Sequence, residues 1–132
     1  MKKIIFLTIL NIAFNSVIAQ VDIATARNQG IGANVTITGI VTNGDELGVI
    51  RYIQDNTAGM ALYDASLSSF QRGDEVTVSG TLVDYNGLLE MNPVNSNSIN
   101  SSGNTVSPQI VTPNQIGEST ESELVQIDNV IF

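Results

Sequence analysis

The sequence predicts an all-β fold, a small closed barrel of five strands. Residues 35–39 (VTITG) and 76–80 (VTVSG) both alternate strictly between apolar and polar side chains and then reach a glycine. Alternation with a period of two is the pattern of a strand with one buried face and one solvated face. A glycine inside such a strand marks a bulge or a sharp bend, as at the corner of a closed barrel. These two stretches are therefore expected to be strands that bend within the barrel wall.

The first 19 residues are expected to form a secretory signal peptide. Lys2 and Lys3 precede a mostly apolar run over residues 4–18, and residues 17–19 (VIA) offer a cleavage site after Ala19. The run is short for a membrane span and carries two asparagines. The absence of cysteine excludes an acylated cysteine at the cleavage site and structural disulfides. We therefore expect a secreted or cell-surface protein with no membrane attachment once the signal is removed.

The charge balance bears on the partners of the exported part. Removal of residues 1–19 leaves 113 of the 132 residues, enough for one domain, and moves the formal net charge from −8 to −10. Three arginines then stand against thirteen acidic residues. Nucleic-acid affinity comes largely from cationic side chains at phosphates, and an acidic surface repels polyanions. The composition therefore argues against strong, sequence-independent binding of nucleic acid.

The elements of the barrel can be placed along residues 20–95. A short helix with Asp22 as its N-cap is expected over residues 21–29. Strands are expected over residues 34–42, 48–54, 60–63, 75–83 and 88–91, with one or two helical turns over residues 65–71. Residues 84–87 (DYNG) give the clearest hairpin signal, because Asn-Gly readily adopts left-handed backbone angles. Three strands, a short helix and two more strands are the order of an OB-fold, a five-stranded Greek-key barrel.

The chain beyond the barrel is expected to be extended. Residues 95–105 are rich in Asn, Ser and Gly and poor in large apolar side chains, so residues 96–122 are interpreted as a linker. Residues 123–132 have strand propensity and end on three apolar residues. They form either a last strand of the barrel or the start of a truncated following domain. We favour the second, because domains seldom end on a bare apolar edge.

Three segments resemble those of bacterial exported OB-fold domains and occur in the same order. They are residues 52–63 (YIQDNTAGMALY), 72–80 (RGDEVTVSG) and 84–91 (DYNGLLEM). Residues 123–132 are similar to the start of a following domain in such proteins. The resemblance covers roughly residues 23–95 and implies an accessory module of a secreted or cell-surface protein, often beside nuclease or phosphoesterase domains. It carries over no catalytic residue.

The sequence lacks the residues of common catalytic centres. Without histidine and cysteine it has no Ser-His-Asp or Cys-His nucleophile and no imidazole or thiolate metal ligand. The candidate carboxylates mostly lie at turn edges, where Asp serves turn geometry; they are Asp45, Glu46, Asp55, Asp64, Asp74, Glu75 and Asp84. Residues 55–57 (DNT) offer oxygen ligands for calcium but lack the further acids of a calcium loop. We expect no catalysis by these residues, no cofactor and no metal site.

Ligand contacts are expected on the second and third strands and on the loops that border them, which form the customary binding face of this barrel. The candidates are Arg51, Tyr52, Tyr63, Tyr85 and Asn86. Aromatic rings and a guanidinium can stack on the bases of a single strand. The alternative for Tyr52 and Tyr63 is a half-buried structural role. The alternative for Arg51 is an ion pair with a neighbouring acid.

These observations predict a monomeric, non-catalytic binding or accessory module. Three functions remain open at this point. The module binds single-stranded nucleic acid weakly, or it is the N-terminal fragment of an extracellular nuclease or phosphoesterase whose catalytic domain lies beyond residue 132. As a third possibility, it is a carbohydrate-binding or spacer module of a cell-surface protein.

Overall fold

The computed structural model describes residues 19–130, so the predicted signal peptide lies outside the described residues except for Ala19. The strands and the helix are β1 (Gln20–Val21), α1 (Ile23–Gln29), β2 (Asn34–Val41), β3 (Ile50–Gln54), β4 (Gly59–Tyr63), β5 (Glu75–Tyr85), β6 (Leu88–Ser101), β7 (Gln109–Ile110) and β8 (Val125–Gln126). Short 3-10 turns lie at Asp45–Leu47, Ala65–Ser69, Pro113–Gln115 and Glu118–Thr120. Within residues 19–130, no helix is both long enough and apolar enough to span a membrane.

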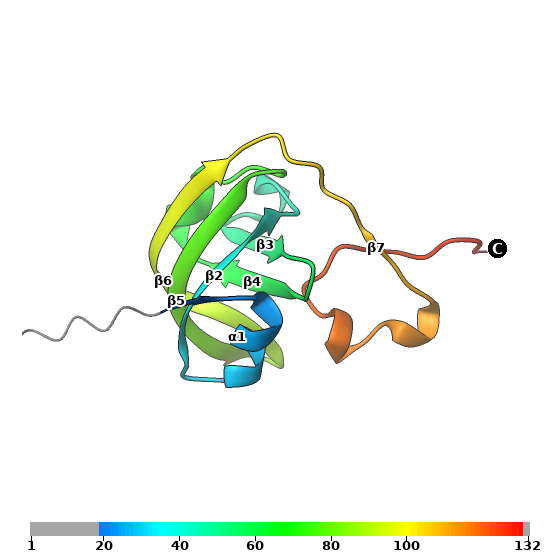
Figure 1. The fold of residues 1–132 in the computed structure, drawn as a ribbon, viewed down its shortest axis with the longest axis horizontal. Coiled ribbons are helices and arrows are strands. Elements are labelled where there is room, and N and C mark those ends of the chain that lie inside the picture. Colours follow the sequence, from blue (N-terminus) through cyan, green and yellow to red (C-terminus); the bar gives the residue numbers. More distant parts are fainter. Residues whose placement is uncertain (1–18, 131–132) are drawn as a thin grey trace, which may run out of the picture.

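Strands β2 to β6 close into a barrel (Figure 1). The order around the barrel is β2-β3-β4-β6-β5, and β5 pairs back onto β2. The β4–β6 pair is parallel and the other four pairs are antiparallel. This is the strand order of an OB-fold, with a 3-10 turn between the third and fourth barrel strands. The predicted fold class is confirmed.

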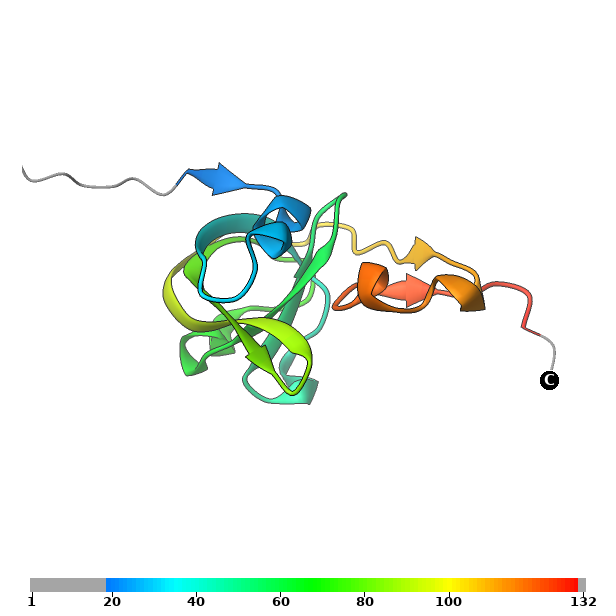
Figure 2. The ribbon, with the colours of Figure 1, turned by 90° about the horizontal axis from the view of Figure 1, so that it is seen from below.

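The barrel core follows the predicted alternation. Val35 and Ile37 of β2 and Val76 and Val78 of β5 are buried, and the polar residues between them lie on the outer face. Figure 2 shows α1 across one end of the barrel, where its buried residues join the same core. Asp22 accepts a hydrogen bond from the Thr25 backbone amide (2.6 Å), so it is the N-cap that the sequence predicts.

The hairpin and one of the two bends also form as predicted. Asn86 (φ 55°) and Gly87 (φ 94°) are the two loop residues between the paired residues Tyr85 and Leu88. Both have the left-handed backbone that a two-residue hairpin of this kind requires. At Gly80 the pairing of β5 with β6 shifts register on both sides, which is a bulge.

Strand β6 is longer than predicted. We expected the fifth barrel strand to end at residue 91 and residues 95–105 to form a loop, but β6 continues to Ser101. Its second half pairs with β5, from Ser96 opposite Ser79 to Ser101 opposite Glu75. Most side chains there are exposed, so they can be polar. The strand forms because its backbone groups pair with those of β5. The sheet therefore extends beyond the predicted domain limit at residue 95.

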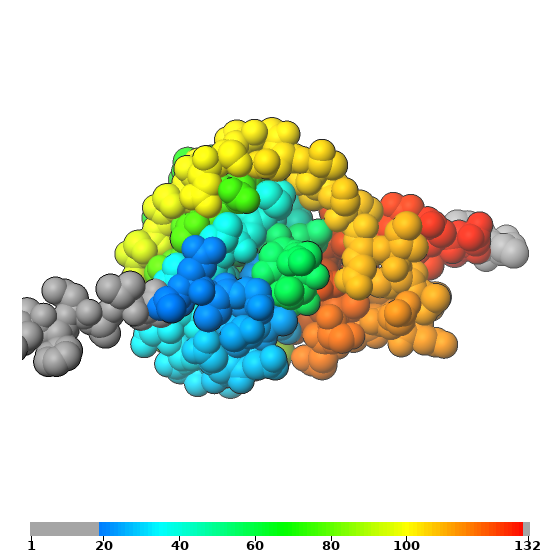
Figure 3. All heavy atoms as spheres, viewed as in Figure 1, coloured from blue at the N-terminus to red at the C-terminus, as the bar shows by residue number. Residues whose placement is uncertain are grey.

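The segment after β6 folds back against the barrel. Its strands β7 and β8 pair with each other in parallel, so β8 does not join the barrel sheet. The Gln54 side chain donates to the Ser107 carbonyl (3.0 Å) and accepts from the Leu124 amide (2.9 Å). Figure 3 shows this segment, in orange, against the green β3–β4 turn. The linker expected over residues 96–122 therefore contains short regular elements and contacts the barrel.

Candidate binding groove on the barrel

Two tyrosines line one groove of about 280 Å³ on the side of the barrel. The lining residues come from the β2–β3 loop, β3, β4, the β5–β6 hairpin and β6; they are Leu47, Ile50, Tyr63, Tyr85, Leu88, Glu90 and Asn92. Tyr63 is 48% exposed and Tyr85 is 62% exposed. Exposed aromatic rings beside apolar side chains are typical of surfaces that bind ring-shaped ligands.

The groove arises from two cross-strand pairs. Ile50 of β3 lies opposite Tyr63 of β4, and Leu88 of β6 lies opposite Tyr85 of β5. Directly opposed residues of neighbouring strands present their side chains on the same face. The β2–β3 loop supplies Leu47, which is 53% exposed, as a further apolar wall. The site therefore has the strands and bordering loops that the sequence predicts.

The floor of the groove contains a buried carboxylate. Glu90 is 3% exposed, and it lies beside Asn92, whose side-chain amide donates to Glu90 Oε1 (3.2 Å). Sequence reasoning missed both residues, and also Leu47, Ile50 and Leu88. For Leu88, Glu90 and Asn92, alternation after the predicted hairpin was the available signal, because residues 88, 90 and 92 of one strand share a face.

Tyr52 lies apart from this groove. It is half-buried and lines a separate hollow of about 440 Å³ between the barrel and residues 122–124. Arg72, whose guanidinium donates to the Thr42 carbonyl, lines the same hollow. Asn86 stands exposed at the tip of the hairpin and does not line the groove. Of the five predicted residues, the structure thus brings together only Tyr63 and Tyr85.

Arg51 is a buried structural residue. It is 1% exposed, and its guanidinium donates only to backbone carbonyls: Phe70 (3.0 Å), Gly48 (2.7 Å), Ile50 (3.0 Å) and Ser68 (3.5 Å). The ion pair that was the alternative for Arg51 does not form, because the one ion pair among residues 19–130 joins Arg27 to Glu121. Arg51 therefore ties the β2–β3 loop to the turn before β5, and it does not face the groove.

The predicted oxygen ligands at residues 55–57 serve the fold. Asp55 accepts hydrogen bonds from the amides of Ile23 (2.9 Å), Thr57 (2.7 Å) and Ala58 (3.0 Å) and from the Thr57 hydroxyl (2.6 Å). Burial acts to raise the pKa of Asp55, but these hydrogen bonds outweigh it and hold the pKa below its ordinary value of 3.8. Asp55 thereby joins the start of α1 to the β3–β4 turn.

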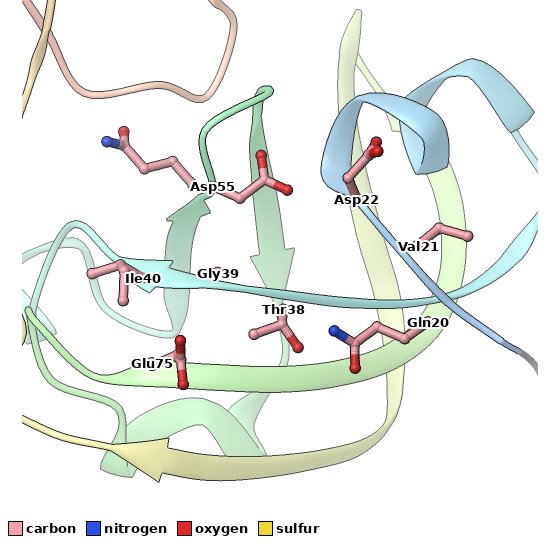
Figure 4. A pocket seen from close by; sticks show the side chains of 9 residues that line it. Gln20, Val21, Asp22, Thr38, Gly39, Ile40, Asp55 and Glu75 are labelled. Carbon is pink, nitrogen blue, oxygen red and sulfur yellow. The ribbon is translucent and has the colours of Figure 1, made fainter.

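A hollow of about 450 Å³ lies next to Asp55, where β2 passes from its pairing with β1 to its pairing with β3. Figure 4 shows the side chains of Asp22, Asp55 and Glu75 around it. Asp22 caps α1 and Asp55 is fully engaged, so these carboxylates do not form a set of free ligands. Across residues 19–130, no three His, Cys, Asp or Glu side chains gather in an arrangement that could hold a metal ion.

Replacing Asp55 by alanine is expected to lower the free energy of unfolding by about 1–2 kcal/mol, because three amides and a hydroxyl lose a partly solvated acceptor. The folded-state pKa is depressed, so the stabilisation is fully present above the unfolded-state pKa and disappears as the pH falls through the folded-state pKa. Urea unfolding of the two proteins at a series of pH values checks this. A difference that stays constant down to the lowest pH would contradict the assignment.

Comparisons with known proteins agree with the fold. No family model matches the chain. The chain is 33% identical over 124 residues to Endonuclease YhcR of Bacillus subtilis. The match covers 82% of this chain and 10% of that protein. The chain thus spans about a tenth of the length of this curated relative. The hypothetical protein ygiW from E. coli superposes with a TM-score of 0.51 at 13% identity, over 61% of this chain and 89% of the other. The chain is therefore an OB-fold barrel whose sequence is similar to one part of an endonuclease.

Proposed function

We propose that this chain is a non-catalytic, exported OB-fold binding module that serves as an accessory to other domains. The observation that carries the proposal is the groove in which Tyr63 and Tyr85 meet on the customary ligand face of the barrel. Similarity to a tenth of an endonuclease supports an accessory role, because the matched part is small against the whole enzyme. The expectation of a monomer belongs to the same proposal.

The residues that line the groove support binding rather than catalysis. Among the residues that line the groove, Glu90 carries the one carboxyl group. Most glycoside hydrolases use two carboxyls, one on either side of the scissile bond. The groove instead offers aromatic and apolar contact area, which stabilises a bound ring by stacking.

A titration followed by NMR tests this function. Oligosaccharides and single-stranded oligonucleotides are added in turn to the isotopically labelled protein at millimolar concentration. At least one class is expected to shift the amide signals of Tyr63, Tyr85 and Leu88 and to leave those of α1 in place. The Tyr63→Ala/Tyr85→Ala variant is expected to lose this response.

The matched control is Tyr52→Ala, which removes a tyrosine from the neighbouring hollow and leaves the groove intact. Its response should equal that of the unmodified protein. If neither class of ligand produces shifts at the groove, or if the double variant still responds fully, the proposed function is wrong.

A further inference from the structure

We infer that the groove binds an uncharged saccharide chain and does not bind nucleic acid. This inference rests on the proposed function, since it names the ligand class of the same site. It follows from three features of the groove: its electrostatics, the free hydrogen-bonding capacity on its floor, and the two exposed tyrosine rings.

The electrostatics disfavour phosphate. None of the described residues that line the groove is Arg or Lys, and Glu90 lies on its floor. The three arginines of residues 19–130 are used elsewhere: Arg27 pairs with Glu121, Arg51 is buried, and Arg72 lies in the neighbouring hollow. Binding of a nucleic-acid strand depends on cationic side chains along its backbone. A phosphate in this groove would instead meet a carboxylate of the same sign.

The floor of the groove offers hydrogen-bond acceptors to a ligand. An ionised carboxylate only accepts, and its two oxygens offer about four acceptor positions. Glu90 has one side-chain donor among the described residues, the amide of Asn92. Neither oxygen of Glu90 is both buried and without a hydrogen-bond partner, so solvent reaches the acceptor positions that Asn92 leaves free. The O–H groups of a ligand can take the place of water there. Sugar hydroxyls both donate and accept, so neighbouring hydroxyls can engage Glu90 and the amide of Asn92 together.

The walls of the groove suit the other surface of a sugar. A pyranose ring has an apolar C–H face, which packs on a tyrosine ring while the hydroxyls at its edge remain free to hydrogen-bond. Tyr63 and Tyr85 are exposed and line the same groove as Glu90, and Ile50 and Leu88 add apolar surface to it. OB-folds use this face for oligosaccharides as well as for oligonucleotides.

Competitive binding measurements test the inference. Neutral hexasaccharides with glucose, N-acetylglucosamine and mannose units are titrated by calorimetry, alongside a single-stranded oligodeoxynucleotide and a short oligolysine peptide. At least one saccharide is expected to bind with an affinity that hardly changes with salt concentration. The oligonucleotide and the peptide are expected not to bind at the groove.

Two variants assign the saccharide binding to the groove. Glu90→Gln preserves the shape of the side chain but removes the charged acceptor, and it is expected to weaken saccharide binding about tenfold. Glu75→Gln removes a carboxylate outside the groove and should leave the affinity unchanged. Thermal unfolding of both variants shows whether the fold is retained. If Glu90→Gln does not fold, Asn92→Ala replaces it, with the same expected direction.

The outcomes separate this inference from the proposed function. Oligonucleotide or oligolysine binding at the groove, without saccharide binding, overturns the saccharide assignment but supports a binding module. No binding of any probe overturns both. Saccharide binding that Glu90→Gln and Asn92→Ala leave unchanged places the ligand elsewhere and overturns the inference.

Discussion

Replacing Arg51 by methionine is expected to lower the free energy of unfolding by about 2–4 kcal/mol, because the hydrogen bonds of a charged donor are lost and a buried carbonyl is left without a partner. Methionine fills much of the same volume but donates no hydrogen bond. The Phe70 carbonyl would then lose its charged donor inside the protein, where an unsatisfied acceptor costs about 1–3 kcal/mol. Gly48 is exposed, so its carbonyl can accept from water instead. Urea unfolding followed by circular dichroism measures the difference.

Arg72→Met is the matched control for this variant. Arg72 is exposed and donates to a single carbonyl, that of Thr42. Its replacement is expected to change the free energy of unfolding by less than about 1 kcal/mol. Equal losses for the two variants would show that Arg51 is not the structural tie between the β2–β3 loop and the turn before β5.

The Arg51→Met variant also probes the groove. The β2–β3 loop carries Leu47, a wall of the groove, and Arg51 fixes this loop through the Gly48 carbonyl. Where the variant still folds, we expect weaker ligand binding even though Arg51 does not line the groove. A residue with this effect positions the site and does not contact the ligand.

The alternation of side chains made the barrel predictable. A period of two places Val35, Ile37, Val76 and Val78 inside, and the Asn-Gly hairpin fixes the register of the last two barrel strands. The same rule would have placed Arg51 inside, because it is two residues before the buried Ile53. The sequence analysis considered a ligand contact or an ion pair for Arg51, and the structure shows neither, since the guanidinium donates to backbone carbonyls.

The remaining differences between prediction and structure arise from strand pairing, which the amino-acid composition does not reveal. The second half of β6 has polar, exposed side chains, which is why its composition resembles that of a loop. Its backbone nevertheless pairs with β5. Tyr52 and Tyr63 lie on neighbouring strands, but Tyr52 is opposite Ala61 and Tyr63 is opposite Ile50. The two tyrosines therefore share one face of the sheet, offset by two residues along the strands, and they line different hollows. Only the closed barrel shows which of them meets Tyr85.

Replacing Gly80 by alanine is expected to lower the free energy of unfolding by about 3 kcal/mol, at the upper end of the usual cost of overpacking. A Cβ atom there would lie 2.6 Å from Met91 Cγ and 2.8 Å from Met91 Sδ, and it would also overlap the backbone carbonyl of Pro93. The methionine side chain can move, but the Pro93 carbonyl lies between the paired residues Met91 and Val94 and cannot shift without disturbing the bulge.

Urea unfolding tests this prediction, with substitutions at two further glycines for comparison. At Gly39 an added Cβ would lie 3.0 Å from the Gln54 carbonyl oxygen, a tight contact that a small shift relieves, so Gly39→Ala should cost about 1 kcal/mol. At Gly117 an added Cβ meets nothing within 4 Å, so Gly117→Ala should be close to neutral. The expected order of stability is Gly117→Ala, Gly39→Ala, Gly80→Ala, from most to least stable. If Gly80→Ala unfolds at the same urea concentration as Gly117→Ala, the barrel does not need glycine at this bend. The close approach of β5 to β6 would then not be the reason for glycine at position 80.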